Sequence, residues 1–182
     1  MYFDLIIAGF GGQGVMFIGN LLAQAAMLEG RKVTYLPVYG VEMRGGTANC
    51  TVVISDQDIG SPSITNPKGC VVMNKPSLVK FGPRVKNDGL LLVNSSLIRP
   101  EEVEVQGPEV IMVPSTELAA EVGNDRLANM IFLGVLIGRT ETVAQTSIKQ
   151  ALIETAGSTN HEILALNTRA VERGVAFGRQ GS

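Results

Sequence analysis

An apolar run at residues 5–8 leads directly into a cluster of glycines and then into a stretch with no charged residue. Gly9, Gly11 and Gly14 match the spacing G-x-G-x-x-G, which in α/β proteins joins a strand to a helix and brings backbone N–H groups close to a phosphate. The candidate ligand-binding residues of this turn are Gly9, Gly11, Gly12, Gln13 and Gly14. The alternative is a turn whose glycines serve only close packing between strand and helix.

Apolar, β-branched segments alternate with helical patterns along the rest of the chain. Strands are expected at 4–8, 32–38, 48–54, 69–73, 90–94 and 110–113, and helices at 14–28, 115–122, 125–138, 147–155 and 162–173. Near-continuous apolar strands are typical of a mainly parallel sheet that is covered on both faces, although residues 47–67 could add an antiparallel excursion. We therefore predict an α/β fold, a Rossmann-like three-layer sandwich that forms a single domain over residues 1–182.

Local signals refine the helices of this prediction. Gly30 is placed to end the first helix in a left-handed conformation, and Ser115 could cap the helix that runs to Val122. Gly134 and Gly138 are four residues apart, which leaves room for close packing of a helix on the sheet. Residues 11–28 carry no charge, so the first helix is expected to be covered on both sides, by this domain or by a partner subunit.

A second glycine-rich loop should emerge at the same edge of the sheet as the first. Its candidate ligand-binding residues are Tyr39, Gly40, Glu42, Arg44, Gly45 and Gly46. Arg44 could present a planar guanidinium to a phosphate or carboxylate, with neutral N–H donors from the two glycines that follow it. In the competing interpretation, Glu42 and Arg44 form ion pairs at a subunit contact.

Composition and charge exclude several functions. The 182 residues include 15 basic and 17 acidic side chains, a formal charge of -2, with no basic run, so neither nucleic acid nor a membrane surface is an expected partner. No stretch reaches the roughly 18 uncharged apolar residues that a membrane-spanning helix needs, and the chain enters a strand pattern almost at once. A cytoplasmic protein is expected.

Catalytic and metal-binding groups are scarce. Cys50 and Cys70 lie in apolar strand-like runs and are too few for an iron–sulfur cluster, which takes about four cysteine ligands. His161 lies in a helical pattern and is assigned no role. A dinucleotide-binding unit would place an acidic residue at the end of the second strand, and Glu42 lies beyond it. The chain is expected to have no catalytic residues and no metal site of its own.

Four motifs together resemble one known family. They are residues 9–15, 39–50, 53–56 and 59–62, with a weaker likeness at Asn129, Leu133, Gly134, Asn167, Ala170 and Gly174. The chain resembles the gamma subunit of 2-oxoacid:ferredoxin (acceptor) oxidoreductases, and residues 42–50 look most like the 2-oxoglutarate type. The beta subunit of indolepyruvate oxidoreductases is a close relative whose residues before the arginine usually differ.

The resemblance implies a multi-subunit enzyme that converts a 2-oxoacid, coenzyme A and oxidised ferredoxin to an acyl-coenzyme A, carbon dioxide and reduced ferredoxin. For the 2-oxoglutarate type, the 2-oxoacid is 2-oxoglutarate and the acyl-coenzyme A is succinyl-CoA. Thiamine diphosphate and iron–sulfur clusters would reside on companion alpha, beta and delta subunits. The glycine turn and the Arg44 loop would help to place coenzyme A. The alternatives are a purely structural subunit, a subunit of a pyruvate, branched-chain or indolepyruvate oxidoreductase, and a free-standing dinucleotide-binding protein.

Overall fold

The computed structural model describes residues 1–39, 47–156 and 161–180 and contains one six-stranded sheet. The strands follow the order β2-β3-β1-β4-β5-β6 across the sheet. Their bounds are β1 (Tyr2–Phe10), β2 (Lys32–Tyr39), β3 (Thr47–Ser55), β4 (Gly69–Val72), β5 (Leu90–Asn94) and β6 (Glu109–Val113). Each lies within two residues of the expected strand, because apolar runs bounded by turn residues locate strands well.

The sheet is parallel over most of its width. β1, β4, β5 and β6 run parallel, with Ile7 opposite Val71 and Val71 opposite Leu92. β3 pairs antiparallel with both β1 and β2, which confirms the antiparallel excursion expected in residues 47–67. The predicted α/β class with a mainly parallel sheet is confirmed.

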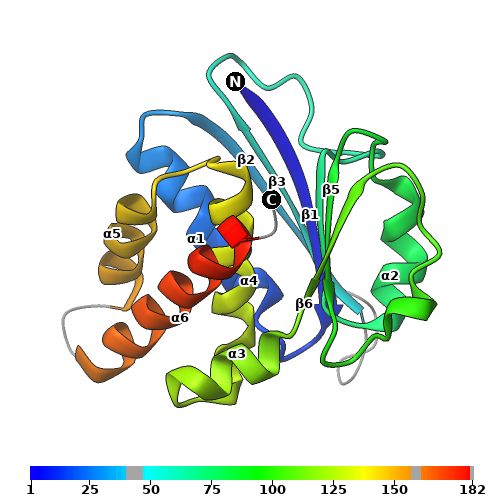
Figure 1. Ribbon diagram of the computed structural model, residues 1–182. Coiled ribbons are helices and arrows are strands. Elements are labelled where there is room, and N and C mark those ends of the chain that lie inside the picture. The colour runs from blue at the N-terminus through cyan, green and yellow to red at the C-terminus, as the bar shows by residue number, and fades with distance from the viewer. Residues whose placement is uncertain (40–46, 157–160, 181–182) are drawn as a thin grey trace.

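Helices cover both faces of the sheet. One face carries α1 (Val15–Leu28), α3 (Ser115–Val122), α4 (Ala128–Thr140), α5 (Gln145–Ala156) and α6 (His161–Gln180), and the other carries α2 (Lys75–Phe81) (Figure 1). Three short 3-10 turns complete the described elements: η1 (Gly82–Arg84), η2 (Pro100–Glu102) and η3 (Asp125–Leu127). The seven residues of α2 were not predicted, since one buried apolar pair, Leu78 and Phe81, is too short a pattern to show a helical period.

The uncharged helix α1 fills the space between the sheet and α5. Its buried side chains include Ile18, Leu21 and Leu22, and it packs on β2 and β3 on one side and on α5 and α4 on another. This domain therefore covers much of α1, whereas the large apolar side chains Phe17, Met27 and Leu28 remain 37–63% exposed. Gly30 follows the helix with φ 75°, as predicted, because a left-handed residue there ends the helix without a Cβ penalty.

The predicted role of Gly134 and Gly138 was wrong in one respect, because their partner is a helix and not the sheet. A Cβ atom at Gly134 would lie 2.2 Å from the carbonyl oxygen of Val171, and one at Gly138 would lie 2.7 Å from that of Val175, both in α6. On α6, Gly174 and Gly178 approach the backbone of α4 equally closely. The two helix backbones are therefore in contact along four glycines, a pairing that spacing within one helix cannot reveal.

The predicted Ser115 cap was also wrong. Ser115 is the first residue of α3, and Pro114, which precedes it at the N-cap position, has no capping side chain. The side chain that accepts from the first turn of α3 is that of Ser96, whose Oγ accepts from the Thr116 N–H at 3.1 Å. The Ser115 hydroxyl instead donates to Asn94 Oδ1 at 3.0 Å. This bond ties the start of α3 to the end of β5.

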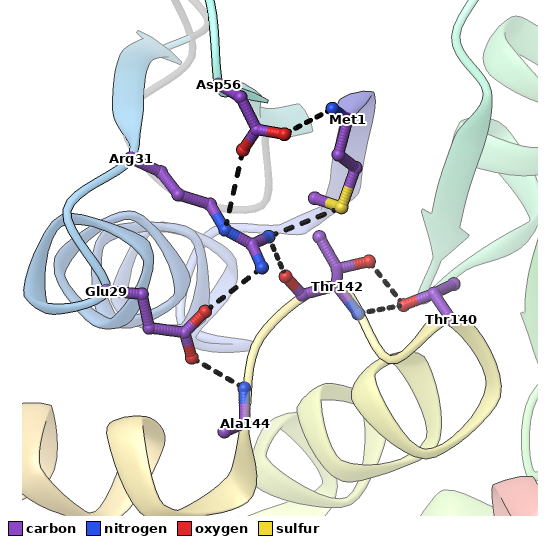
Figure 2. Close-up of polar contacts among 7 residues, drawn as sticks. All are labelled: Met1, Glu29, Arg31, Asp56, Thr140, Thr142 and Ala144. Atoms are coloured by element: carbon purple, nitrogen blue, oxygen red, sulfur yellow. Dashed lines mark hydrogen bonds and ion pairs between the residues drawn. The ribbon is translucent and has the colours of Figure 1, made fainter.

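Arg31 joins three segments at the edge of the sheet where α1 and α4 end (Figure 2). Its guanidinium donates to the carbonyl oxygen of Thr142 and pairs with Glu29 at 3.3 Å. Glu29 in turn accepts from the backbone N–H of Ala144 at 2.7 Å. Asp56, which follows β3, lies 4.0 Å from Arg31. The loop between α4 and α5 is thereby fixed to α1 and to the sheet.

The two cysteines are buried on opposite faces of the sheet. Cys50 packs with the cluster under α1, whereas Cys70 packs with the cluster under α2. Burial raises the pKa of each thiol to about 12. Because the thiolate is the reactive form, we expect neither cysteine to react with Ellman's reagent at pH 8 in the native protein, and two equivalents to react after denaturation. Rapid labelling of the folded chain would contradict this burial.

Candidate functional site

A crevice lies at the point in the sheet where the connections after two neighbouring strands, β1 and β4, run to opposite faces. β1 and β4 are parallel neighbours, yet β1 is followed by α1 on one face and β4 by α2 on the other. In open α/β sheets, ligands bind in the crevice at the carboxyl ends of the strands at such a reversal. The residues that can reach this crevice therefore follow β1, β4 and β5.

The predicted glycine turn lies at this position and needs its glycines for two different reasons. Gly12 and Gly14 have φ values of 93° and 76°, a backbone region that side chains rarely tolerate. Gly9 is extended, but a Cβ atom there would lie 2.6 Å from Gln13 Oε1 and 3.1 Å from Met73 Cβ. At Gly11 a Cβ atom would meet nothing within 4 Å, so that position faces open space.

The Gln13 side chain lines the crevice and also forms hydrogen bonds within the protein. Its Oε1 accepts from the backbone N–H of Phe10 at 2.7 Å, and its Nε2 donates to the carbonyl oxygen of Met73 at 3.4 Å. The side chain therefore closes the turn and links the end of β1 to the residue after β4. Gln13 also lines the crevice, and its predicted role in ligand binding stays a prediction.

Two helices begin at the crevice. The N-cap residues are Gly14 for α1 and Leu127 for α4, and neither N-terminus has a side-chain cap or an acidic residue in its first turn. The two starts lie side by side, because Nδ2 of Asn129, in the first turn of α4, would be 2.2 Å from a Cβ atom at Gly14. The positive ends of two helix dipoles thus point toward one space, an arrangement that favours an anion.

The crevice encloses about 460 Å³, within the range of small-molecule sites. Its lining residues come from the glycine turn, the ends of β4 and β5, and the start of α4: Gly12, Gln13, Met73, Asn94, Asp125, Arg126, Ala128, Asn129 and Phe132. Amides, one carboxylate and one guanidinium suit binding and orientation of a polar ligand more than proton transfer.

Sequence reasoning missed most of the lining that lies outside the glycine turn. Asn94 ends β5, where its Nδ2 donates to the Met73 carbonyl at 3.1 Å and its Oδ1 accepts from Ser96 N–H at 3.1 Å. Asn74 likewise follows β4 and caps α2 by accepting from Ser77 N–H. A polar residue at the end of a buried strand or within two residues of it is a signal that could have located both positions.

The second predicted loop starts and ends beside the first. Phe10 pairs with Thr47, and Gly9 pairs with Ala48, which in turn pairs with the backbone of Tyr39. The anchors of the loop are therefore at the expected edge of the sheet. Gly40, Glu42, Arg44, Gly45 and Gly46, and the side chain of Tyr39, lie outside the described residues, so their predicted roles stay predictions.

The described residues form neither a cluster of metal ligands nor a membrane-spanning helix. Over 1–39, 47–156 and 161–180, no group of three or more His, Cys, Asp or Glu side chains could hold a metal ion. Cys50 and Cys70 cannot share an iron–sulfur cluster, because the sheet separates them. None of the helices in this part of the chain is long and apolar enough to cross a membrane.

Comparison with known proteins identifies the family. Residues 4–177 match the family described as pyruvate ferredoxin/flavodoxin oxidoreductase. Subunit VorA of a ketoisovalerate oxidoreductase from Methanothermobacter thermautotrophicus is 38% identical over 96% of this chain, which spans only 36% of VorA. Subunit KorC of a 2-oxoglutarate synthase from the same organism is 35% identical, with 82% of each chain covered.

Solved structures share the fold. The gamma subunit of a keto/oxoacid ferredoxin oxidoreductase from Geobacter sulfurreducens has a TM-score of 0.83 at 23% identity and covers 98% of this chain and 99% of its own. A 2-oxoglutarate:ferredoxin oxidoreductase from Magnetococcus marinus, which has 2-oxoglutarate, coenzyme A and succinyl-CoA bound, has a TM-score of 0.90 at 22% identity and covers the whole chain with 32% of its own. The match over nearly the full length shows that this chain belongs to the pyruvate ferredoxin/flavodoxin oxidoreductase family, as its motifs suggested.

Proposed function

We propose that residues 1–182 act as one gamma-type domain, a subunit of a cytoplasmic 2-oxoacid:ferredoxin oxidoreductase. Its partners would be alpha, beta and delta chains that hold thiamine diphosphate and the iron–sulfur clusters, with ferredoxin reached through the complex. The family match and the separation of Cys50 from Cys70 support this division.

The contribution of this chain would be to bind and orient coenzyme A. The observation that carries this proposal is the crevice of about 460 Å³ at the glycine turn, where the N-termini of α1 and α4 meet. Positive helix ends and open backbone N–H groups suit the phosphates of coenzyme A. A ligand held there at its phosphate end would have its thiol directed out of this chain, toward partner subunits. Positioning of this kind lowers the entropic cost of the acyl transfer step.

We propose 2-oxoglutarate as the 2-oxoacid. KorC, a 2-oxoglutarate synthase subunit, is matched along 82–90% of its length in two organisms. One observation favours a second candidate, ketoisovalerate: the VorA sequences share 38% identity with this chain. In those relatives the matched region is about a third of a longer protein.

Purification of the tagged chain from its native host without air tests the assembly. We expect a thiamine-binding chain and a cluster-bearing chain in stoichiometric amount, identified by mass spectrometry. The purified complex should reduce a viologen dye when given coenzyme A and 2-oxoglutarate, faster than with ketoisovalerate or pyruvate. Recovery of the chain alone, or only as a homo-oligomer, would contradict the proposal. Preference for ketoisovalerate would retain the subunit role and change the substrate.

A further inference from the structure

The crevice contains two charged side chains that the glycine turn does not supply, on the short helix η3 between α3 and α4. Asp125 and Arg126 both line it. Their backbone is fixed, because Asn124 Oδ1 accepts from the Arg126 N–H at 3.0 Å and the Asn124 carbonyl accepts from the Leu127 N–H at 3.1 Å. The two side chains are therefore presented to the crevice from a braced turn.

The guanidinium of Arg126 differs from those of several other arginines in its ion pairing. Arg31, Arg139 and Arg173 engage the carboxylates of Glu29, Glu109 and Glu121 at 2.7–3.3 Å. Within the described residues, Arg126 is in no ion pair within 4.0 Å, even though Asp125 is its neighbour. Its five donors are thus available to a ligand in the crevice.

The two charges, taken with their surroundings, suit two different groups of one ligand. Arg126 shares the crevice with Gly12, in the turn before α1, and with the start of α4, whose N-terminus also favours negative charge. A Cβ atom at Gly12 would meet nothing within 4 Å, which leaves its backbone accessible. A guanidinium matches the geometry of a phosphate. The Asp125 carboxylate can accept hydrogen bonds but cannot donate them, so it would accept one from a hydroxyl. Its negative charge would repel a second anion next to the phosphate.

We propose that Arg126 is the phosphate-binding and specificity-determining residue of this crevice, and that Asp125 accepts from the adjacent ribose hydroxyl. The ligand class is a ribose phosphate, so the crevice takes the nucleotide end of coenzyme A and not the carboxylate of the 2-oxoacid. The identity of that ligand as coenzyme A rests on the proposed function, whereas the preference for a ribose phosphate does not.

Kinetics of the assembled enzyme test the assignment. Arg126→Gln should raise the KM for coenzyme A about tenfold and leave kcat and the KM for the 2-oxoacid unchanged. With dephospho-coenzyme A, loss of the effect would place the 3′-phosphate at Arg126, and persistence of the effect would place the pyrophosphate there; both support phosphate binding. Arg179→Gln, which changes an arginine in a separate pocket beside Arg31, should leave all three constants unchanged. An unchanged KM for coenzyme A in Arg126→Gln, or a raised KM for the 2-oxoacid alone, would overturn the assignment.

Binding to the full chain separates this inference from the proposed function. Adenosine 3′,5′-bisphosphate is the probe, and calorimetry at two salt concentrations is the measurement. We expect binding that weakens about tenfold in Arg126→Gln and weakens with added salt. Such binding in a chain that recovers no partner subunits would refute the subunit role and support the crevice assignment. An active complex in which wild type and Arg126→Gln have the same KM for coenzyme A would support the subunit role and refute the crevice assignment. Absence of both probe binding and coenzyme A dependence would overturn the assignment.

Discussion

Gly134→Ala is expected to reduce the free energy of unfolding by about 3 kcal/mol, because the added methyl group has nowhere to go. Its Cβ atom would lie 2.2 Å from the Val171 carbonyl oxygen and 2.9 Å from Gly174 Cα, both backbone atoms of α6. Backbone atoms cannot rotate aside as a side chain can, so α4 and α6 would have to separate. The gain in helix propensity from glycine to alanine, about 1 kcal/mol, offsets only part of this cost.

Thermal and denaturant unfolding measure the effect, which should appear as a decrease in Tm of roughly 10 °C. Gly60→Ala is the matched control, since a Cβ atom there meets nothing within 4 Å and the residue does not need a left-handed backbone. That variant should unfold within about 0.5 kcal/mol of wild type. If Gly134→Ala were equally neutral, the direct contact between the helix backbones would be wrong.

Gly14→Ala is expected to reduce kcat/KM for coenzyme A about a hundredfold in the assembled enzyme, because it displaces the crevice wall. Gly14 has φ 76°, and a Cβ atom there would lie 2.2 Å from Asn129 Nδ2. The start of α1 or the Asn129 side chain must move, and both belong to the proposed coenzyme A site. The protein should remain folded, since a left-handed alanine costs about 1 kcal/mol.

Steady-state kinetics and thermal unfolding of two further variants separate strain from function. Gly30→Ala introduces the same strain, at φ 75°, at the other end of α1 and in open space. It should lose only the stability that the left-handed backbone costs, about 1 kcal/mol, and retain its kinetics. In Gly14→Ala, the added change Asn129→Ala should recover part of the lost stability, as a double-mutant cycle would show. Normal kinetics in Gly14→Ala would exclude this end of α1 from coenzyme A binding.

The site was predicted in part because one of its two sides is encoded locally. The glycine turn follows directly on β1, and positive φ at Gly12 and Gly14 is a property that spacing can reveal. Arg126 and Asn129 lie more than a hundred residues later and reach the turn only because α4 begins beside α1. Asn94 was missed although it ends a predicted strand, since a single amide carries no periodic signal.

The sequence by itself determined the α/β class, the positions of the six strands, the turn after β1 and the family. These features depend on local patterns: apolar runs, glycine spacing and motifs that are contiguous in the chain. The tertiary structure decided which distant residues the residues of these patterns contact. Gly134 packs on α6 and not on the sheet, Ser115 bonds to Asn94 and does not cap α3, and Cys50 and Cys70 are separated by the sheet. Each of these outcomes depends on a partner distant in sequence, which helix packing and strand order select and no local pattern records.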